Sequence, residues 1–262
     1  MLVDTHCHLA ATEFSGDRQR VAEAARCVGV SAIVVPSVDR ASFAAVRACC
    51  TDLPGCFPAY GIHPLYVAQA AETDLERLRE QLAESRSGRP PAVAVGEIGL
   101  DRFVAEPDLA RQEFFFVEQL RIARQVQLPV LLHVRRAVDL VLAHLRRIPV
   151  PGGIAHAFNG SRQQADELIR LGFRLGFGGA VTHSRSTRIR QLATCLPLEA
   201  IVLETDSPDM PPEWLAGARN TPDQLPRINA LLAGLRGIPA RELARATSAN
   251  AAAVLPELRL PT

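Results

Sequence analysis

The sequence predicts an α/β fold in which eight parallel strands close into a single (β/α)8 TIM barrel. Short β-branched runs alternate with longer amphipathic stretches along 262 residues, a length typical of this barrel. No glycine-rich phosphate fingerprint follows the first run, which disfavours an open doubly wound sheet. The chain also shows no internal repeat or domain linker. We therefore expect one barrel domain over residues 1–262.

Strands are expected where short apolar runs are rich in β-branched residues and are bounded by turn residues. Eight runs meet this description, and they alternate with helical patterns in the order that a barrel requires. The expected strands are Val3–His6, Ala32–Pro36, Phe57–Gly61, Ala92–Glu97, Pro129–His133, Gly153–His156, Phe173–Phe177 and Ile201–Glu204.

Helices are expected where apolar residues recur with a period of three to four. Ser161 and Gln164 form a capping-box sequence that opens the helix after the sixth strand. The apolar stripes are Leu75, Leu78 and Leu82; Phe116, Leu120 and Ala123; Val138, Val141, Leu142 and Leu145; and Leu225, Ile228, Leu232 and Leu235.

Composition narrows the class of function. A formal net charge of +1 does not favour wrapping of long nucleic acid, so phosphate contacts are expected to be local. No apolar run is long enough to span a bilayer, and histidines near the first residue leave no room for a secretory signal. The six cysteines show no metal-type spacing and are expected to be free thiols. We expect a cytoplasmic enzyme without a membrane or an obligate protein partner.

The chain contains no lysine, because all 29 of its basic residues are arginine. It therefore has no Schiff-base lysine, no phosphate-loop lysine and no carboxylated lysine that could bridge two metals.

Functional groups of such barrels lie where the strands end, at the carboxyl-terminal face. The first strand runs into two histidines that flank Cys7. Because side chains alternate along a strand, both histidines are expected on one face and Cys7 on the other. Four further strand ends carry a histidine or a carboxylate. The complete set is His6, His8, Glu97, His133, His156 and Asp206.

Four imidazoles and two carboxylates suit two divalent ions better than one. A carboxylate can bridge through its two oxygens, and Glu97 is the expected bridge in a chain without lysine. The mixed ligand set suits Zn²⁺, Mn²⁺ or iron better than Mg²⁺, without excluding Mg²⁺. One ion is expected on His6, His8 and Asp206, and the other on His133 and His156.

Motifs over almost the whole chain carry a family resemblance. They are Asp4-Thr5-His6-Cys7-His8, Gly61-Ile62-His63-Pro64, Gly96-Glu97-Ile98-Gly99-Leu100-Asp101, His133 with Arg135, His156 with Phe158 and Gly160, Glu204-Thr205-Asp206-Ser207-Pro208, Asn220 with Pro222, and Asn250. The chain resembles the TatD-type metal-dependent deoxyribonucleases, in particular their YjjV-like branch. The resemblance implies a metallo-dependent-hydrolase barrel, two divalent metals, the same six ligands and 3′–5′ exonuclease-like hydrolysis of DNA phosphodiester bonds. DNA ends or short single-stranded DNA are the implied substrates.

Other residues have expected roles around this centre. Asp206 is the expected proton acceptor from the attacking water, and Glu97 and Asp206 are the expected catalytic carboxylates. His63, Arg135 and Arg102 are expected to contact substrate, and Glu204 is expected to support the ligands. Arg102 stands where the family often has an aromatic residue, which bears on the substrate. Trp214 is expected to anchor its loop, and His144 to lie on the surface.

Two other classes of function remain open on the sequence. The same metal-activated water could attack a carbonyl carbon, as in an amidohydrolase or in an aminoacyl-ester hydrolase acting on a small substrate or on charged RNA. A non-enzymatic scaffold that keeps the barrel is the third reading, and the complete ligand set disfavours it.

Overall fold

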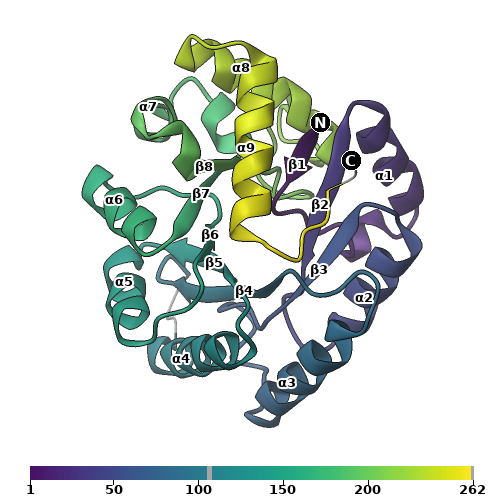
Figure 1. Ribbon diagram of the computed structural model, residues 1–262, viewed down its shortest axis with the longest axis vertical. Coiled ribbons are helices and arrows are strands. Elements are labelled where there is room, and N and C mark those ends of the chain that lie inside the picture. Colours follow the sequence, from purple (N-terminus) through teal and green to yellow (C-terminus); the bar gives the residue numbers. More distant parts are fainter. Residues whose placement is uncertain (105–107, 261–262) are drawn as a thin grey trace.

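The computed structural model describes residues 1–104 and 108–260, and the predicted barrel is confirmed (Figure 1). Eight parallel strands follow one another around the sheet in sequence order, from β1 to β8. The strands are β1 Leu2–Asp4, β2 Val30–Pro36, β3 Cys56–Tyr60, β4 Ala94–Asp101, β5 Val130–Arg135, β6 Gly153–Ala155, β7 Phe173–Phe177 and β8 Ile201–Leu203.

Main-chain hydrogen bonds just beyond the last strand close the barrel. The amide of Thr5 donates to the carbonyl of Leu203 at 3.0 Å, and the amide of Asp206 donates to the carbonyl of His6 at 2.8 Å. A third bond joins the amide of His8 to the carbonyl of Ser207 at 2.7 Å. The segments that follow β1 and β8 are therefore held together at the carboxyl-terminal end.

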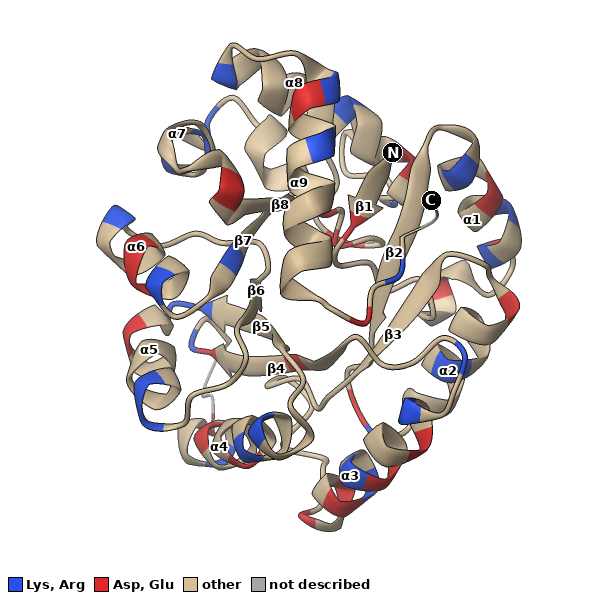
Figure 2. Cartoon of the chain, in the orientation of Figure 1, with Lys and Arg blue, Asp and Glu red and all other residues tan. Residues whose placement is uncertain are grey.

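Helices surround the sheet (Figure 1). In the described part of the chain, none is both long and apolar enough to cross a membrane. Basic and acidic residues are interspersed over the outer helices (Figure 2), in keeping with a net charge of +1. The helices are α1 Arg18–Cys27, α2 Phe43–Asp52, α3 Thr73–Arg86, α4 Leu109–Val126, α5 Val138–Arg147, α6 Arg162–Arg170, α7 Thr187–Cys195, α8 Leu225–Arg236 and α9 Ala240–Val254.

The apolar core has two parts on opposite sides of the sheet. Between strands and helices, the predicted stripe of α4 is fully buried, as is its neighbour Phe115. Inside the barrel, small and branched side chains such as Val34, Ala59 and Ile154 form a separate cluster. The predicted capping box of Ser161 and Gln164 is confirmed at the start of α6.

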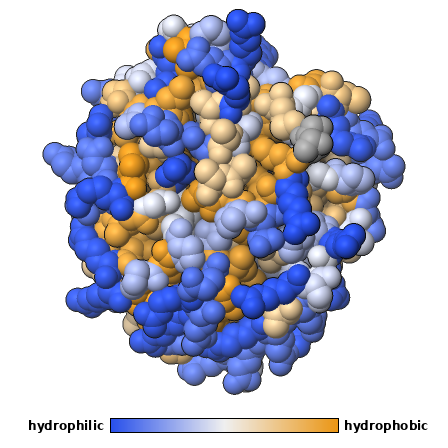
Figure 3. All heavy atoms as spheres, in the orientation of Figure 1, coloured by the Kyte–Doolittle hydropathy of each residue, from blue (hydrophilic) through white to orange (hydrophobic). Residues whose placement is uncertain are grey.

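Helix α9 closes the amino-terminal end of the barrel, where it crosses the strand ends (Figure 1). Ala251, Val254 and Leu255 join the cluster inside the barrel. In the same view, hydrophilic residues ring this face and hydrophobic residues show beside α9 (Figure 3). This helix has no counterpart among the predicted elements, because its alanine-rich sequence carries few large apolar residues at helical spacing.

Three predicted strands are shorter in the structure, including β6, which ends at Ala155 and leaves His156 beyond it. β1 ends at Asp4 and β8 at Leu203, so His6 and Glu204 lie beyond the strands. The prediction that these strands reach them was wrong because the Asp4 carboxylate takes up amides that would otherwise continue the ladder, including the amide of His6 at 3.2 Å.

Two other predicted strands extend further at their carboxyl-terminal ends. β4 runs on to Asp101 and β5 to Arg135, so Glu97 and His133 lie within strands. Pairing continues because Gly99 lies against the main chain of β5. A Cβ atom at this position would lie 1.9 Å from the carbonyl oxygen of His133. The pairing of Ile98–Asp101 with Leu132–Arg135 consequently fixes the end of β4 and β5 that carries their functional side chains.

Helix α4 fixes the ends of β3 and β4 through two buried glutamines. Gln119 accepts from the amide of Ile62 at 2.7 Å and donates to its carbonyl at 3.0 Å. Gln112 makes the equivalent pair of bonds with Asp101, at 2.8 and 3.1 Å. Each glutamine satisfies the main chain as a neighbouring strand would.

Candidate metal centre

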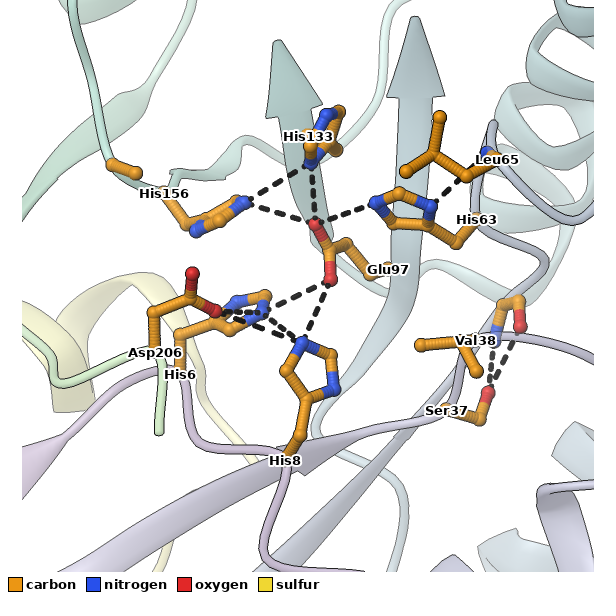
Figure 4. A network of polar contacts seen from close by, with 12 residues as sticks. His6, His8, Ser37, Val38, His63, Leu65, Glu97, His133, His156 and Asp206 are labelled. Atoms are coloured by element: carbon orange, nitrogen blue, oxygen red, sulfur yellow. Dashed lines mark hydrogen bonds and ion pairs between the residues drawn. The ribbon is translucent and has the colours of Figure 1, made fainter. Parts of the chain in front are cut away.

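Glu97 lies at the centre of a polar cluster at the carboxyl-terminal end of the barrel (Figure 4). Its side chain is only 1% exposed. The two carboxylate oxygens face different histidines, so Glu97 divides the cluster into two halves. The structure brings all six predicted ligands into this cluster (Figure 4).

The first half is built on Oε2 of Glu97 and comes from the segments after β1 and β8. His6 Nε2 lies 3.0 Å from this oxygen, and His8 Nε2 lies 3.3 Å from it. Oδ1 of Asp206 is 3.6 Å from each of these nitrogens. Cys7 points away into the outer core, as the alternation predicts.

The second half is built on Oε1 of Glu97. His156 Nε2 lies 2.9 Å from this oxygen, His133 Nδ1 lies 3.0 Å away, and His63 Nε2 lies 3.4 Å away. The segment after β3, strand β5 and the turn after β6 therefore direct imidazoles at one carboxylate oxygen.

The spacing of the imidazoles fits divalent metal ions. Two nitrogens that bind one tetrahedral Zn²⁺ at about 2.0–2.1 Å lie about 3.3 Å apart. The Nε2 atoms of His6 and His8 are 3.3 Å apart. Nδ1 of His133 and Nε2 of His156 are 3.4 Å apart. Each pair therefore has the spacing of two ligands on one ion, with one oxygen of Glu97 beside it.

The charges of the cluster also suit a cation. Burial lowers the pKa of His6 to about 3, so this ring is neutral, as an imidazole that binds a metal ion must be. Burial alone would raise the pKa of Glu97, but the surrounding histidines hold it well below its usual range. An ionised carboxylate therefore lies at the centre of the ring of imidazoles, where it attracts a positive ion.

Comparison with known proteins places the chain in a family. A family model described as "TatD related DNase" matches residues 3–256. The chain belongs to the TatD family. A protein of Escherichia coli K12 named "Uncharacterized metal-dependent hydrolase YjjV" is 40% identical over 249 residues, which are 95% of each chain. The crystal structure of the Escherichia coli K12 YjjV protein superposes with a TM-score of 0.93 at 38% identity, over 97% of this chain and 98% of that one.

A second relative carries a more specific name. A protein of Erwinia billingiae named "3'-5' ssDNA/RNA exonuclease TatD" is 32% identical over an alignment of 260 residues, which covers 95% of this chain and 97% of the relative. The predicted resemblance is thus confirmed, and the chain is a metal-dependent hydrolase of the TatD family.

In this TatD-family chain, Asp101 orients one of the central histidines. Its Oδ2 lies 2.9 Å from Nε2 of His133, which leaves Nδ1 of the same ring facing Glu97. A carboxylate that accepts the proton of one ring nitrogen fixes which nitrogen can bind a metal. No role for Asp101 was predicted. The available signal was its position four residues after Glu97 in one strand, which places both on the same face.

Asp4 holds the first half of the centre in place and also had no predicted role. Its carboxylate accepts from Oγ1 of Thr205 at 2.6 Å, from the amide of Thr205 at 3.0 Å and from the amide of His6 at 3.2 Å. These bonds join the segments after β1 and β8, so His6 and Asp206 are held at a fixed separation. An aspartate just before the first histidine was the only signal in the sequence.

Glu204 lies where a supporting residue would be expected. Its Oε1 is 3.8 Å from Nδ1 of His156 and accepts from the amide of Ala157. Burial raises the pKa of Glu204 to about 8. Gly176 leaves room for this carboxylate, because a Cβ atom there would lie 2.0 Å from its Oε2.

His63 has a defined proton position. Its Nδ1 accepts from the amide of Leu65 at 3.1 Å, so a neutral ring carries its hydrogen on Nε2. That nitrogen faces Glu97 and the centre (Figure 4). His63 is therefore arranged as a hydrogen-bond donor rather than as a metal ligand. Arg102 and Arg135 are exposed at the ends of β4 and β5.

Two residues outside the centre, Trp214 and His144, also had predicted positions. Trp214 donates from Nε1 to Gln224 at 2.9 Å, which confirms that it anchors its loop. The prediction that His144 lies on the surface was wrong. The residue is buried, and its Nε2 lies 2.8 Å from Glu113 on α4. It joins two helices because its ring lies on the buried side of α5, edge-on to Phe116.

Proposed function

We propose that the chain is a dinuclear phosphodiesterase that removes nucleotides from the 3′ end of single-stranded DNA or RNA. The observation that carries the proposal is that the two carboxylate oxygens of Glu97 face two separate pairs of imidazoles. The name of the Erwinia billingiae relative supports the choice of substrate and polarity.

The proposed ligands follow this division. Glu97 would hold both of two divalent ions, for which Zn²⁺, Mn²⁺ and Mg²⁺ are candidates. Two such ions, when bound, acidify water and stabilise the charge that develops on a phosphate. The first ion is assigned to His6, His8 and Asp206, and the second to His133 and His156.

Asp206 is the proposed proton acceptor. Its side chain is 14% exposed, whereas that of Glu97 is 1% exposed, so Asp206 is the carboxylate of the centre that water can reach. In the proposed reaction the attacking water transfers a proton to Asp206 as its oxygen bonds to phosphorus. The bond from phosphorus to the leaving 3′ oxygen breaks, and that oxygen takes up a proton.

Three further residues are assigned to the substrate. His63 would donate from Nε2 to a non-bridging phosphate oxygen, which is the role that its proton position allows. Arg135 and Arg102 lie at the same end of the barrel and would bind phosphate oxygens as the chain enters. Their guanidinium groups neutralise charge without taking part in proton transfer.

The proposal is tested with metal-depleted protein to which Mn²⁺, Zn²⁺ or Mg²⁺ is returned. We expect single-stranded DNA with a 5′ label to be shortened stepwise from its 3′ end only after a metal is returned. Asp206→Ala is expected to lose nearly all turnover while its far-UV circular dichroism matches that of the wild type.

A panel of carboxylic esters, amides and aminoacylated RNA, assayed in parallel, serves as the matched comparison. Turnover of one of these substrates without turnover of DNA would reassign the enzyme to carbonyl chemistry. Wild-type turnover by Asp206→Ala would remove this residue from the mechanism. Elemental analysis that finds no metal in protein reloaded with these ions would contradict the dinuclear centre.

A further inference from the structure

Phe103 is an exposed aromatic residue at the mouth of the barrel, and two arginines pack on it. The exposed fraction of Phe103 is 47%. The guanidinium carbon of Arg135 lies 3.6 Å from the centre of its ring, and that of Arg136 lies 4.5 Å from the same point. A ring that contacts two guanidinium groups fixes the direction of both.

The backbone explains how two consecutive arginines reach one ring. Neighbouring residues in a strand point to opposite faces. Arg135 ends β5, and Arg136 then adopts a left-handed conformation with φ of 55°. This turn lets the second guanidinium reach the same ring as the first. A left-handed conformation is unfavourable for arginine, so packing on Phe103 compensates for part of its cost.

The arrangement is joined to the metal centre by short hydrogen bonds. The amide of Arg102 donates to the carbonyl of Arg135 at 2.9 Å. The amide of Phe103 donates to Oδ1 of Asp101 at 2.7 Å, and the other oxygen of Asp101 holds His133. The two guanidinium groups are therefore fixed relative to the proposed second metal position.

The described residues offer the two charges few other partners. Within residues 1–104 and 108–260, no carboxylate lies within 4.0 Å of either guanidinium. Both arginines are exposed to solvent. Two positive planar groups that gather on one ring at the end of β5 are suited to bind phosphates of a nucleic acid strand.

We propose that Phe103, Arg135 and Arg136 form a phosphate clamp for the strand next to the bond that is cut. Arg135 and Arg136 bind the phosphates, and Phe103 is the positioning residue that holds both guanidinium groups. The clamp would make the enzyme prefer a polynucleotide end to a single phosphodiester. This inference rests on the proposed phosphodiesterase function and extends it to the part of the substrate beyond the reacting phosphate.

The first test compares kinetics on two substrates: a single-stranded oligonucleotide of about eight residues, and the p-nitrophenyl ester of thymidine 5′-monophosphate, which lacks neighbouring phosphates. We expect Arg136→Ala to raise the ratio of the KM for the oligonucleotide to the KM for the ester about tenfold, as for the loss of one charge-assisted contact. Phe103→Ala should raise the same ratio. Phe103→Trp should keep the wild-type ratio, because tryptophan is the strongest aromatic partner for a cation.

The second test measures the salt dependence of oligonucleotide binding by fluorescence anisotropy, without turnover. Loss of one phosphate contact reduces the slope of log K against log salt by about 0.7 for a single strand. We expect this change in Arg136→Ala. The matched controls are Arg245→Ala, an exposed arginine on α9 at the opposite end of the barrel, and Phe114→Ala, a phenylalanine 39% exposed on α4.

The outcomes separate the two proposals. Wild-type protein that cleaves no polynucleotide contradicts the proposed function, and the anisotropy slopes then decide on the clamp alone. Cleavage by the wild type together with equal slopes and KM ratios in Arg136→Ala and Arg245→Ala overturns the clamp and leaves the proposed function standing.

Discussion

The two ends of the barrel are filled by side chains of opposite character, apolar at one end and polar at the other. At the amino-terminal end, α9 covers the strands and adds Val254 and Leu255 to an apolar cluster inside the barrel. At the carboxyl-terminal end, the interior is filled by imidazoles and carboxylates around Glu97 (Figure 4). The same eight strands contribute to both ends.

The difference shows how the barrel separates stability from chemistry. Apolar packing at the closed end is stabilising in any protonation or metal state, because it depends only on excluding water. The polar end places several ionisable groups out of water, which is unfavourable unless an ion or a hydrogen bond satisfies them. Damage at one end should therefore leave the other end largely unaffected, and variants at each end test this separation.

The largest effect is expected from Glu97→Gln. The amide keeps the shape of the side chain but loses the charge that faces both halves of the centre. We expect turnover to fall by more than about 100-fold, beyond the usual loss from a residue that only supports a ligand. Bound metal, measured by elemental analysis, should fall with it. Retention of full metal content and turnover would show that Glu97 does not bridge the two halves.

The converse variant is Leu255→Ala at the closed end. Leu255 is fully buried beneath the barrel. Its truncation should lower the free energy of unfolding in urea by about 2–5 kcal/mol, the usual range for a buried leucine. Metal content at saturating metal should match the wild type. A loss of metal as large as that in Glu97→Gln would show that the two ends are coupled.

A smaller effect is expected from Asp101→Asn. The amide can present its NH₂ group to His133 and favour the other tautomer of the ring. We expect a 10- to 100-fold, order-of-magnitude loss in metal affinity or kcat/KM, as is usual for a residue that orients a ligand. Asp108→Asn is the control, because Asp108 caps α4 and does not contact the centre. Equal kinetics in the two variants would remove Asp101 from the centre.

The smallest effect concerns an exposed pair that joins the loops after β1 and β8. Hydrogen bonds from Arg219 and Arg20 lower the pKa of Asp17 to about 2, from an ordinary value of 3.8. Because the folded-state pKa is lowered, this pair stabilises the fold above pH 3.8, and the contribution is lost as pH falls towards 2. Asp17→Asn should therefore be slightly less stable than the wild type in urea above pH 3.8, with the difference narrowing as pH falls. A difference that does not change with pH would contradict this assignment.

Much of the centre could be predicted from the sequence because barrel strands carry functional groups at one end. His6, His8, Glu97, His133, His156 and Asp206 were found by locating strand ends, and the family comparison agrees with the resulting chemistry. The order of the strands and the apolar stripes of the helices followed from local periodicity.

Residues that act on other residues were harder to find. Asp101 and Asp4 bind a side chain or main chain that is distant in the sequence, so periodicity alone gave no role for either. The contact of Phe103 with two arginines likewise depends on a left-handed turn at Arg136. Helix α9 was missed because alanine contacts the barrel closely without leaving a strong apolar stripe.

The sequence by itself determined the fold class, the residue types of the candidate metal centre and the absence of any lysine that could bridge metals. Only the tertiary structure decided that Glu97 presents its two oxygens to different histidines, and which nitrogen of His63 and of His133 faces the centre. The physical reason is that residue type and spacing are local properties. The direction of a lone pair depends on hydrogen bonds made by several strands at once.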